Sequence, residues 1–212
     1  MYTPRAFVES DLRALDALAA NDSFITLITV ADGVPQVSHL PVLYRRDGES
    51  VELIGHFARP NPQARHAGAA LAIFHGPDSY ISPAWYPDKE TQARVPTWNY
   101  AVAHIHGEMG MFDDTDALAT LVSELSDKYE ASVGSSWQFE AERPELRDQL
   151  RGIVGFRLRA ERILLKYKLS QNHPLANRSS VVEHLEGLDD AAGHAIAAMM
   201  RARLDIPTAE EH

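Results

Sequence analysis

Apolar residues recur along this chain with two periods, one typical of helices and one typical of strands. Near the N-terminus, Leu12, Leu15 and Leu18 fall at helical spacing. Ser10 and Asp11 precede them, and either side chain can cap the N-terminus of a helix. We therefore predict an amphipathic helix over this segment.

Strand-like segments follow this helix. Residues 23–31 are rich in β-branched side chains, and the D-G pair at 32–33 is a hairpin turn signal before a return strand at 34–44. A second turn, R-D-G at 46–48, leads into a third strand at 51–57. Two consecutive hairpins of this kind predict an antiparallel meander.

The remainder of the chain alternates between strands and helices. Asn61 and Pro62 are typical of a helix cap and a first helical position, which predicts a short helix to about Ala67. Further strands are predicted at residues 70–76, 97–112 and 153–168. Further helices are predicted at residues 114–130, at 144–151 and, in two parts around Gly187, at 174–204.

Two segments between these elements lack a clear period. Residues 80–87 hold two prolines and are predicted as a loop or an edge, and the polar residues 131–143 are predicted as a loop. Residues 205–212 are expected to be disordered. Roughly six antiparallel strands with peripheral helices predict a mainly β fold of the α+β kind, a small barrel with flanking helices.

Composition narrows the class of protein. The chain has 212 residues and 45% hydrophobic content, enough for one core or a core with a small appendage. Its net charge of −10 comes from 20 basic and 30 acidic residues, so direct nucleic-acid binding is not supported by charge. Cysteine is absent, which excludes disulfides, thiol nucleophiles and thiolate metal sites.

No targeting pattern is visible in the sequence. The longest apolar runs fall well short of the roughly 18 residues that a membrane span needs, so no membrane association is expected. The first residues lack a basic region followed by an apolar one, so no secretory signal is predicted. We expect a cytoplasmic location.

Residues 95–112 are unusually rich in aromatic and hydrogen-bonding groups for a strand. The segment carries Trp98, Asn99, His104, His106 and Glu108. Trp joins an apolar ring to a polar edge, and an Asn amide both donates and accepts hydrogen bonds. This combination favours a flat heteroaromatic ligand over a dry core.

The two histidines and the glutamate of this strand also raise the question of a metal. His104, His106 and Glu108 alternate, so their side chains point to one face. The competing interpretation is that these histidines are buried and hydrogen-bonded. Since no cysteine and no second motif supply a further ligand, we predict no metal site, while heme bound through a strand histidine stays open.

A second candidate region lies at residues 55–63, G-H-F-A-R-P-N-P-Q. Arg59 stands between a predicted strand and a predicted helix start, where free N–H groups and a guanidinium favour a phosphate. An ordinary capped helix with a surface arginine is the alternative. The third region, K-Y-K-L-S-Q-N at 166–172, is either a ligand rim or the cap of the next helix.

Catalytic motifs are missing from the sequence. It contains neither G-x-S-x-G nor G-x-G-x-x-G nor a P-loop, so we assign no catalytic residues and predict no Rossmann-type nucleotide site.

Taken together, these segments resemble the PaiB family, the FMN-binding negative transcriptional regulators. The matching motifs run in family order: M-Y-T-P-R-A-F at 1–7, S-H-L-P-V at 38–42, the motif at 55–63, Y-I-S-P-A-W-Y-P at 80–87, V-P-T-W-N-Y at 95–100, H-I-H-G at 104–107 and K-Y-K-L-S-Q-N at 166–172. Where the family usually has Trp, this chain has Tyr167. The resemblance implies an antiparallel split β-barrel like that of pyridoxamine 5′-phosphate oxidase, and a homodimer with FMN at its interface.

The resemblance also implies where FMN would bind. Arg59, Asn61 and Gln63 would hold its phosphate. The isoalloxazine would lie along four residues of the first motif, Ser38, His39, Leu40 and Val42. Six further residues would complete the pocket, in part from the partner subunit: Thr97, Trp98, Asn99, Lys168, Ser170 and Gln171.

The resemblance implies a flavin-binding domain at residues 1–186, with a C-terminal helix and tail at 187–212. Three functions stay open: an FMN-binding regulator that acts indirectly, an FMN-dependent oxidoreductase on an unknown small substrate, and a heme-binding split barrel. A small-molecule ligand beside FMN is compatible with the first two.

Overall fold

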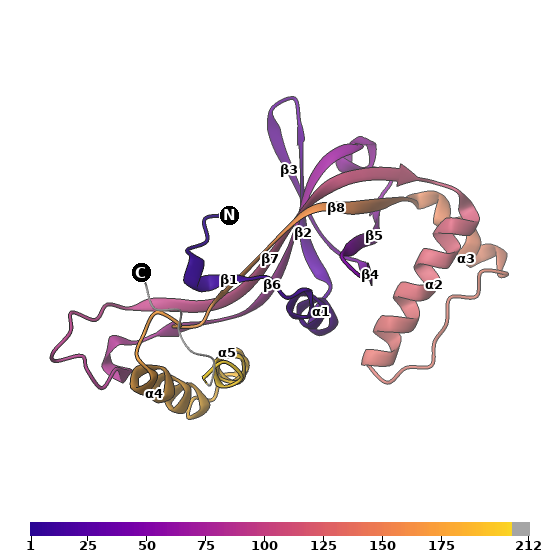
Figure 1. The fold of residues 1–212 in the computed structure, drawn as a ribbon. Coiled ribbons are helices and arrows are strands. Elements are labelled where there is room, and N and C mark those ends of the chain that lie inside the picture. Colours follow the sequence, from indigo (N-terminus) through magenta and orange to yellow (C-terminus); the bar gives the residue numbers. More distant parts are fainter. Residues whose placement is uncertain (205–212) are drawn as a thin grey trace. The chain divides into compact units, whose positions relative to one another are not determined.

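The computed structural model describes residues 1–204 (Figure 1). The strands are β1 (Val8–Glu9), β2 (Phe24–Ala31), β3 (Val34–Pro41), β4 (Leu43–Asp47), β5 (Ser50–Ala58), β6 (Gly68–Ile81), β7 (Thr97–Phe112) and β8 (Ile153–Lys168). The helices are α1 (Leu12–Asn21), α2 (Thr115–Ser132), α3 (Pro144–Gln149), α4 (Leu175–Glu186) and α5 (Ala191–Arg201), with 3₁₀ turns η1 (Arg5–Phe7), η2 (Pro62–Arg65), η3 (Pro83–Trp85) and η4 (Leu150–Gly152). The expected disorder of residues 205–212 lies outside the described residues.

The chain forms two compact units. The first unit contains Met1–Leu15, His75–Ala103 and the segment from Leu164 onward, and the second contains Asp16–Phe74 and His104–Ile163. The long strands β6, β7 and β8 each continue from one unit into the other.

The strands form one sheet with the order β3-β2-β6-β7-β8-β5-β4, and β1 pairs with β8. The pairs β2–β3, β2–β6, β4–β5, β5–β8 and β1–β8 are all antiparallel. Residues 1–204 contain this sheet and five α-helices, so the predicted mainly β fold of the α+β kind is confirmed.

The predicted meander is wrong. The two hairpins β2–β3 and β4–β5 form as expected, but β3 and β4 lie at opposite ends of the strand order. The predicted strand at 34–44 is broken at Val42, whose backbone N–H donates to the carbonyl oxygen of Ser23. This break ends β3, and within residues 1–204 the following strand β4 pairs only with β5, its partner in the second hairpin.

Two other elements differ from their prediction. The helix expected near residues 61–67 is the four-residue 3₁₀ turn η2, capped by the side chain of Asn61, which accepts from the backbone N–H of Gln63. The strand expected at 70–76 extends to Ile81, so β6 includes the start of the proline-containing segment. Strands β7 and β8 match the predicted ranges.

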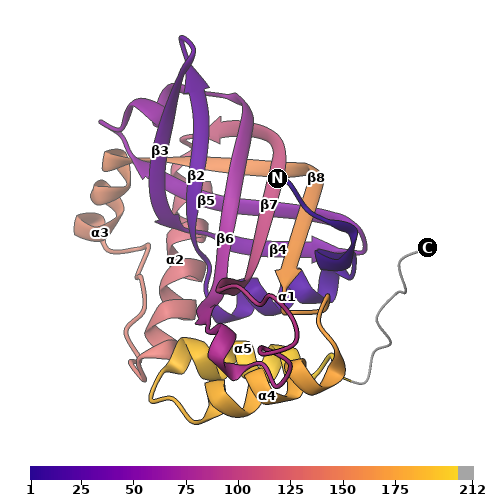
Figure 2. The same ribbon diagram turned by 90° about the vertical axis from the view of Figure 1, so that its left-hand side faces the viewer.

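The core of the second unit is built on alternating side chains. On β2, Ile25 and Leu27 are buried, while Phe24 and Val30 on the opposite face are more than half exposed. Figure 2 shows the β2–β3 hairpin beside β6. The helix α2 covers another part of this core, where its leucines pack against Leu43 of β4.

A close approach of two backbones explains one glycine of the second unit. A Cβ atom at Gly107 of β7 would lie 1.9 Å from the carbonyl oxygen of Arg159 in β8. No side chain fits this space, since non-bonded heavy atoms pack at roughly 3.5–4.0 Å. The glycine of the H-I-H-G motif therefore allows β7 and β8 to lie close together.

The first unit has its own core around α4 and α5, which lie side by side in Figure 1. Val181 and Leu185 of α4 and Ile196 of α5 are fully buried. An ion pair between Arg94 and Asp88 orders the loop between β6 and β7. Asn177 of α4 is buried, and its Nδ2 donates a hydrogen bond of 2.9 Å to the carboxylate of Asp88. This bond joins the loop to α4.

Candidate functional site

In the second unit, a hydrogen-bonded cluster joins β3 to η2. The Ser38 hydroxyl donates to the Oε1 of Gln63 over 2.5 Å and accepts from the Nδ2 of Asn61 over 2.9 Å. The Nε2 of Gln63 donates to the Thr29 hydroxyl at 3.1 Å and to the carbonyl oxygen of Gln36 at 3.0 Å. Gln63 is almost fully buried, and these hydrogen bonds hold the turn against the β2–β3 hairpin.

Arg59 precedes this cluster in the chain and is anchored to backbone. Its Nε donates to the carbonyl oxygen of Arg151 at 2.7 Å, and its Nη2 donates to that of Ile153 at 2.9 Å. Its Nη1 lies 4.0 Å from the carboxylate of Asp113, and the side chain is about half exposed. A guanidinium has more N–H groups than these contacts use, so donors remain for an anion.

The residues predicted to line the isoalloxazine lie on both faces of β3. Ser38 and Leu40 point to the buried side, whereas His39 is exposed and lies 3.1 Å from the Thr26 hydroxyl. Val42 is fully buried just after the strand. The structure therefore separates His39 from its neighbours, because successive strand residues face opposite sides.

In the first unit, Lys168 at the end of β8 meets the start of β7. Its Nζ donates to the Thr97 hydroxyl at 2.5 Å and to the carbonyl oxygen of Trp98 at 2.6 Å. Burial lowers the pKa of Lys168, and the nearby charge of Lys166 lowers it further. The predicted association of the 95–100 and 166–172 motifs is present in the structure.

Two more of the predicted residues, Asn99 and Ser170, are buried and form hydrogen bonds with each other. The Nδ2 of Asn99 donates to the Ser170 hydroxyl at 3.0 Å, and that hydroxyl is 3.2 Å from the Oδ1 of Asn99. Ser170 has a φ of 61°, an uncommon conformation for a non-glycine residue. This pair joins β7 to the residues that directly follow β8.

Gln171 also serves its own segment. Its Oε1 accepts from the backbone N–H of Leu169 at 2.7 Å, and its Nε2 donates to the carbonyl oxygen of Tyr167 at 2.5 Å. The next helix, α4, has Pro174 at its cap position and no side-chain cap bond. Gln171 therefore closes the end of β8 and does not cap the helix.

Sequence reasoning did not single out Lys166 and Tyr100. Lys166 is buried. Its Nζ donates a hydrogen bond of 3.1 Å to the carbonyl oxygen of Tyr2, and the same atom lies 5.2 Å from the centre of the Tyr100 ring. The sequence did contain a signal for Lys166: it stands two residues before Lys168 on one predicted strand, so the two lysines are expected on the same face.

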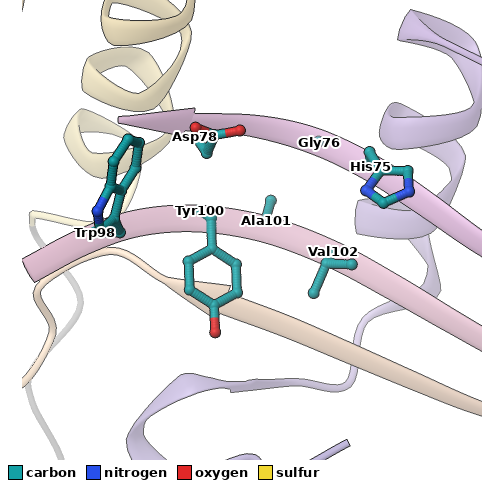
Figure 3. Close-up of a pocket in the computed structure, with 7 residues that line it drawn as sticks. All are labelled: His75, Gly76, Asp78, Trp98, Tyr100, Ala101 and Val102. Atoms are coloured by element: carbon teal, nitrogen blue, oxygen red, sulfur yellow. The ribbon is translucent and has the colours of Figure 1, made fainter. Parts of the chain in front are cut away.

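Trp98 is the most accessible of the predicted residues in the first unit, with 53% of its surface exposed. It borders a shallow hollow of about 360 Å³ between β6 and β7, which Figure 3 shows with His75, Asp78 and Tyr100. The Trp98 indole stands at one end of this hollow and His75 at the other (Figure 3). Such a surface can contact a planar ring.

The histidines of β7, His104 and His106, were also considered as metal ligands. The rings of His104 and His106 lie 6.4 Å apart, and the Nε2 of His106 is buried with no hydrogen-bond partner among the described residues. Burial lowers the pKa of His106, with a smaller contribution from the charge of Arg162. Within residues 1–204, no group of three or more His, Cys, Asp or Glu side chains is placed to hold a metal ion.

None of the helices within residues 1–204 has the length and apolar character needed to cross a membrane.

Comparisons with known proteins support a flavin-related assignment. Residues 1–162 match the family described as "Putative FMN-binding domain". The Bacillus subtilis protein named Protease synthase and sporulation protein PAI 2 is 33% identical over 208 residues, which covers 96% of this chain and 98% of that protein.

Solved structures share the fold at low sequence identity. A FAD and heme binding protein from Mycobacterium smegmatis superposes with a TM-score of 0.56 at 18% identity, covering 76% of this chain and 72% of that chain. The flavocytochrome Anf3 from Azotobacter vinelandii gives a TM-score of 0.56 at 14% identity, covering 78% and 72%. The predicted fold class, an antiparallel split β-barrel with flanking helices, is confirmed. Since the family match spans 162 of the 212 residues and the Bacillus relative is aligned over nearly its whole length, the chain belongs to the PaiB family of FMN-binding-domain proteins.

Proposed function

We propose that this protein binds FMN and that Arg59 holds its phosphate together with the hydrogen-bonded cluster of Ser38, Asn61 and Gln63. The observation that carries the proposal is the anchoring of Arg59. Two of its N–H groups are fixed on the backbone of residues 151–153, which orients the rest of the guanidinium at low entropic cost. A planar, oriented guanidinium suits a phosphate, because it can donate two parallel hydrogen bonds.

The residues beside Arg59 fit a phosphate as well. The Nδ2 of Asn61 uses one N–H for the Ser38 hydroxyl, which leaves its second N–H for a ligand oxygen. The helix-dipole contribution expected from the sequence is small, because η2 is a single 3₁₀ turn. The fit therefore depends on side-chain donors, with buried Gln63 holding Ser38 and Asn61 in place.

The pocket is completed by the first-unit residues Thr97, Trp98 and Lys168, which we assign to the partner subunit of a homodimer. Exposed apolar side chains support a dimer. Phe24 and Val30 of β2 and Val37 of β3 share one face of the hairpin, and each is more than half exposed. A patch of this kind on a sheet face is typical of an interaction surface.

When bound, FMN supplies electron or hydride transfer. The chain itself would bind and orient the cofactor: Arg59 and Asn61 at the phosphate, and Trp98 at a ring. Lys168, a cation held near Trp98 by hydrogen bonds, would place positive charge beside the flavin. We assign no substrate.

We further propose that any regulatory role is indirect. The net charge of −10 opposes binding to a phosphodiester backbone. Several arginines near the start of β8 are paired with carboxylates, as in the contacts of Arg157 and Arg159 with Glu52. A gel-shift that shows tight, salt-sensitive and sequence-specific DNA binding by the purified protein would contradict this part of the proposal.

The proposal is tested by the visible spectrum of the protein after incubation with FMN and removal of free ligand. Flavin bands at a stoichiometry near one per chain support it, and a Soret band without flavin bands points to heme. Light scattering on the same sample tests the dimer. A monomer at all concentrations, still loaded with flavin, would contradict a pocket shared between subunits.

A further inference from the structure

The first unit contains a second hollow, which also borders Trp98. It has a volume of about 440 Å³ and is lined mainly by Tyr80, Trp85, Trp98, Leu188, Asp78 and Asp190. These residues come from the end of β6, from η3, from the start of β7 and from the turn before α5. Its size is in the range of small-molecule sites, roughly 300–1,000 Å³.

All charged side chains that line this hollow are negative. Two carboxylates line it, and no Lys, Arg or His is among its lining residues. Asp190 caps α5, because its carboxylate accepts from the backbone N–H groups of Ala192 and Gly193. The N–H groups that could attract an anion are thus already used. Asp78 is exposed, and no hydrogen bond or ion pair within residues 1–204 engages its carboxylate.

Three aromatic rings form the walls, and one of them, Trp85, is held by contacts outside the hollow. The Tyr80 and Trp98 rings meet edge to face with centroids 6.0 Å apart. Trp85 stacks on His184 at 5.4 Å, and its carbonyl oxygen accepts from the Ser180 hydroxyl at 2.6 Å. Aromatic faces attract cations through their quadrupole, and Trp does so most strongly.

We propose that this hollow binds an organic cation, a protonated amine that carries an apolar group. The ammonium would lie between the carboxylate of Asp78 and the aromatic faces, and the apolar group would contact Leu188 and the indole of Trp85. A neutral or anionic analogue lacks the attraction to both the carboxylates and the rings. The hollow shares Trp98 with the proposed flavin pocket, but Arg59 and the residues proposed to hold the phosphate do not line it.

The test uses three probes with the same phenyl group, namely phenethylamine, 2-phenylethanol and phenylacetate, with binding followed by tryptophan fluorescence and by calorimetry at neutral pH. We expect phenethylamine to bind at least about tenfold more tightly than 2-phenylethanol, because cation–π and carboxylate contacts act together. Phenylacetate should show no binding. Equal affinity for the amine and the alcohol would overturn the proposal.

Two variants locate the site. Asp78→Asn should weaken phenethylamine binding by about threefold, and Trp85→Leu by about threefold or more. The control Asp189→Asn removes the same charge from an exposed residue of the α4–α5 turn that does not line the hollow, and should bind the amine like the unaltered protein. Equal losses in Asp78→Asn and Asp189→Asn would indicate general charge attraction and contradict the site.

Competition separates this proposal from the flavin proposal. Phenethylamine binding is measured with and without saturating FMN, and the FMN affinity is recorded in the same samples. Unchanged amine affinity supports a separate cation site. Displacement of the amine by FMN would mean that the hollow belongs to the cofactor pocket and would overturn the inference, while the FMN affinity decides the flavin proposal on its own.

Discussion

The hydroxyl of Ser38 donates a 2.5 Å hydrogen bond to the Oε1 of Gln63, and so fastens β3 to the turn η2. Gln63 in turn donates to the Thr29 hydroxyl and to the carbonyl oxygen of Gln36. A buried amide with these partners connects the phosphate candidates to the β2–β3 hairpin. The arrangement makes Gln63 a structural residue of the site more than a direct ligand.

Gln63→Ala should lower the free energy of unfolding by about 2–4 kcal/mol, because several buried polar groups lose their partner and a cavity forms. Urea denaturation measures this value. The control Gln92→Ala alters an exposed glutamine and should change stability by less than about 0.5 kcal/mol. A Gln63→Ala protein as stable as the control would show that the cluster contributes nothing to the fold.

Gly107→Ala should destabilise the second unit by about 3 kcal/mol or more, because the new Cβ would overlap the carbonyl oxygen of Arg159. Gly110→Ala in the same strand is the matched control, since nothing lies within 4 Å of a Cβ at that position. Thermal unfolding of both variants makes the comparison. Similar midpoints for the two would contradict the close approach of β7 and β8.

The Asp88–Arg94 pair predicts a dependence of stability on pH. The hydrogen bond from Arg94 is the largest cause that lowers the pKa of Asp88, to about 2, and the one from Asn177 adds to it. A depressed pKa in the folded state stabilises the protein above the unfolded value of about 3.9, and this contribution is lost as the pH falls toward 2.

Asp88→Asn should therefore be less stable than the unaltered protein at neutral pH, and the difference should shrink between about pH 4 and pH 2. Urea midpoints across this range test the prediction. Asp189→Asn, at an exposed position, should track the unaltered protein throughout. A difference for Asp88→Asn that stays constant with pH would show that the ion pair does not cause it.

Local patterns predicted much of the fold. β7 and β8 match their predicted ranges, and in β7 the more buried and less buried side chains alternate along most of the strand, which is a strong local signal. The placement of β3 and β4 at opposite ends of the strand order could not be predicted in this way. It depends on distant partners and on the bond from Val42 to Ser23, which interrupts a sequence that reads as one continuous strand.

The candidate site was predictable in part. The motifs singled out the polar residues, and the structure brings Lys168 to Thr97 and Ser38 to Asn61. The sequence could not show that Gln171 bonds back to its own segment, since this depends on how β8 ends. Nor could it show which residues are buried supports, because polar side chains with identical spacing can bind a ligand or each other.

The central claim is that Arg59 binds the phosphate of FMN, and the most direct measurement compares FMN with riboflavin, which lacks the phosphate. We expect FMN to bind the unaltered protein more tightly than riboflavin. Arg59→Ala should reduce FMN affinity by about ten- to a hundredfold and leave riboflavin affinity nearly unchanged. Arg65→Ala, which removes an exposed charge from the same turn, should have a small effect on both. Equal affinity for the two flavins, or an Arg59→Ala protein that still prefers FMN as strongly as the unaltered protein does, would contradict the assignment.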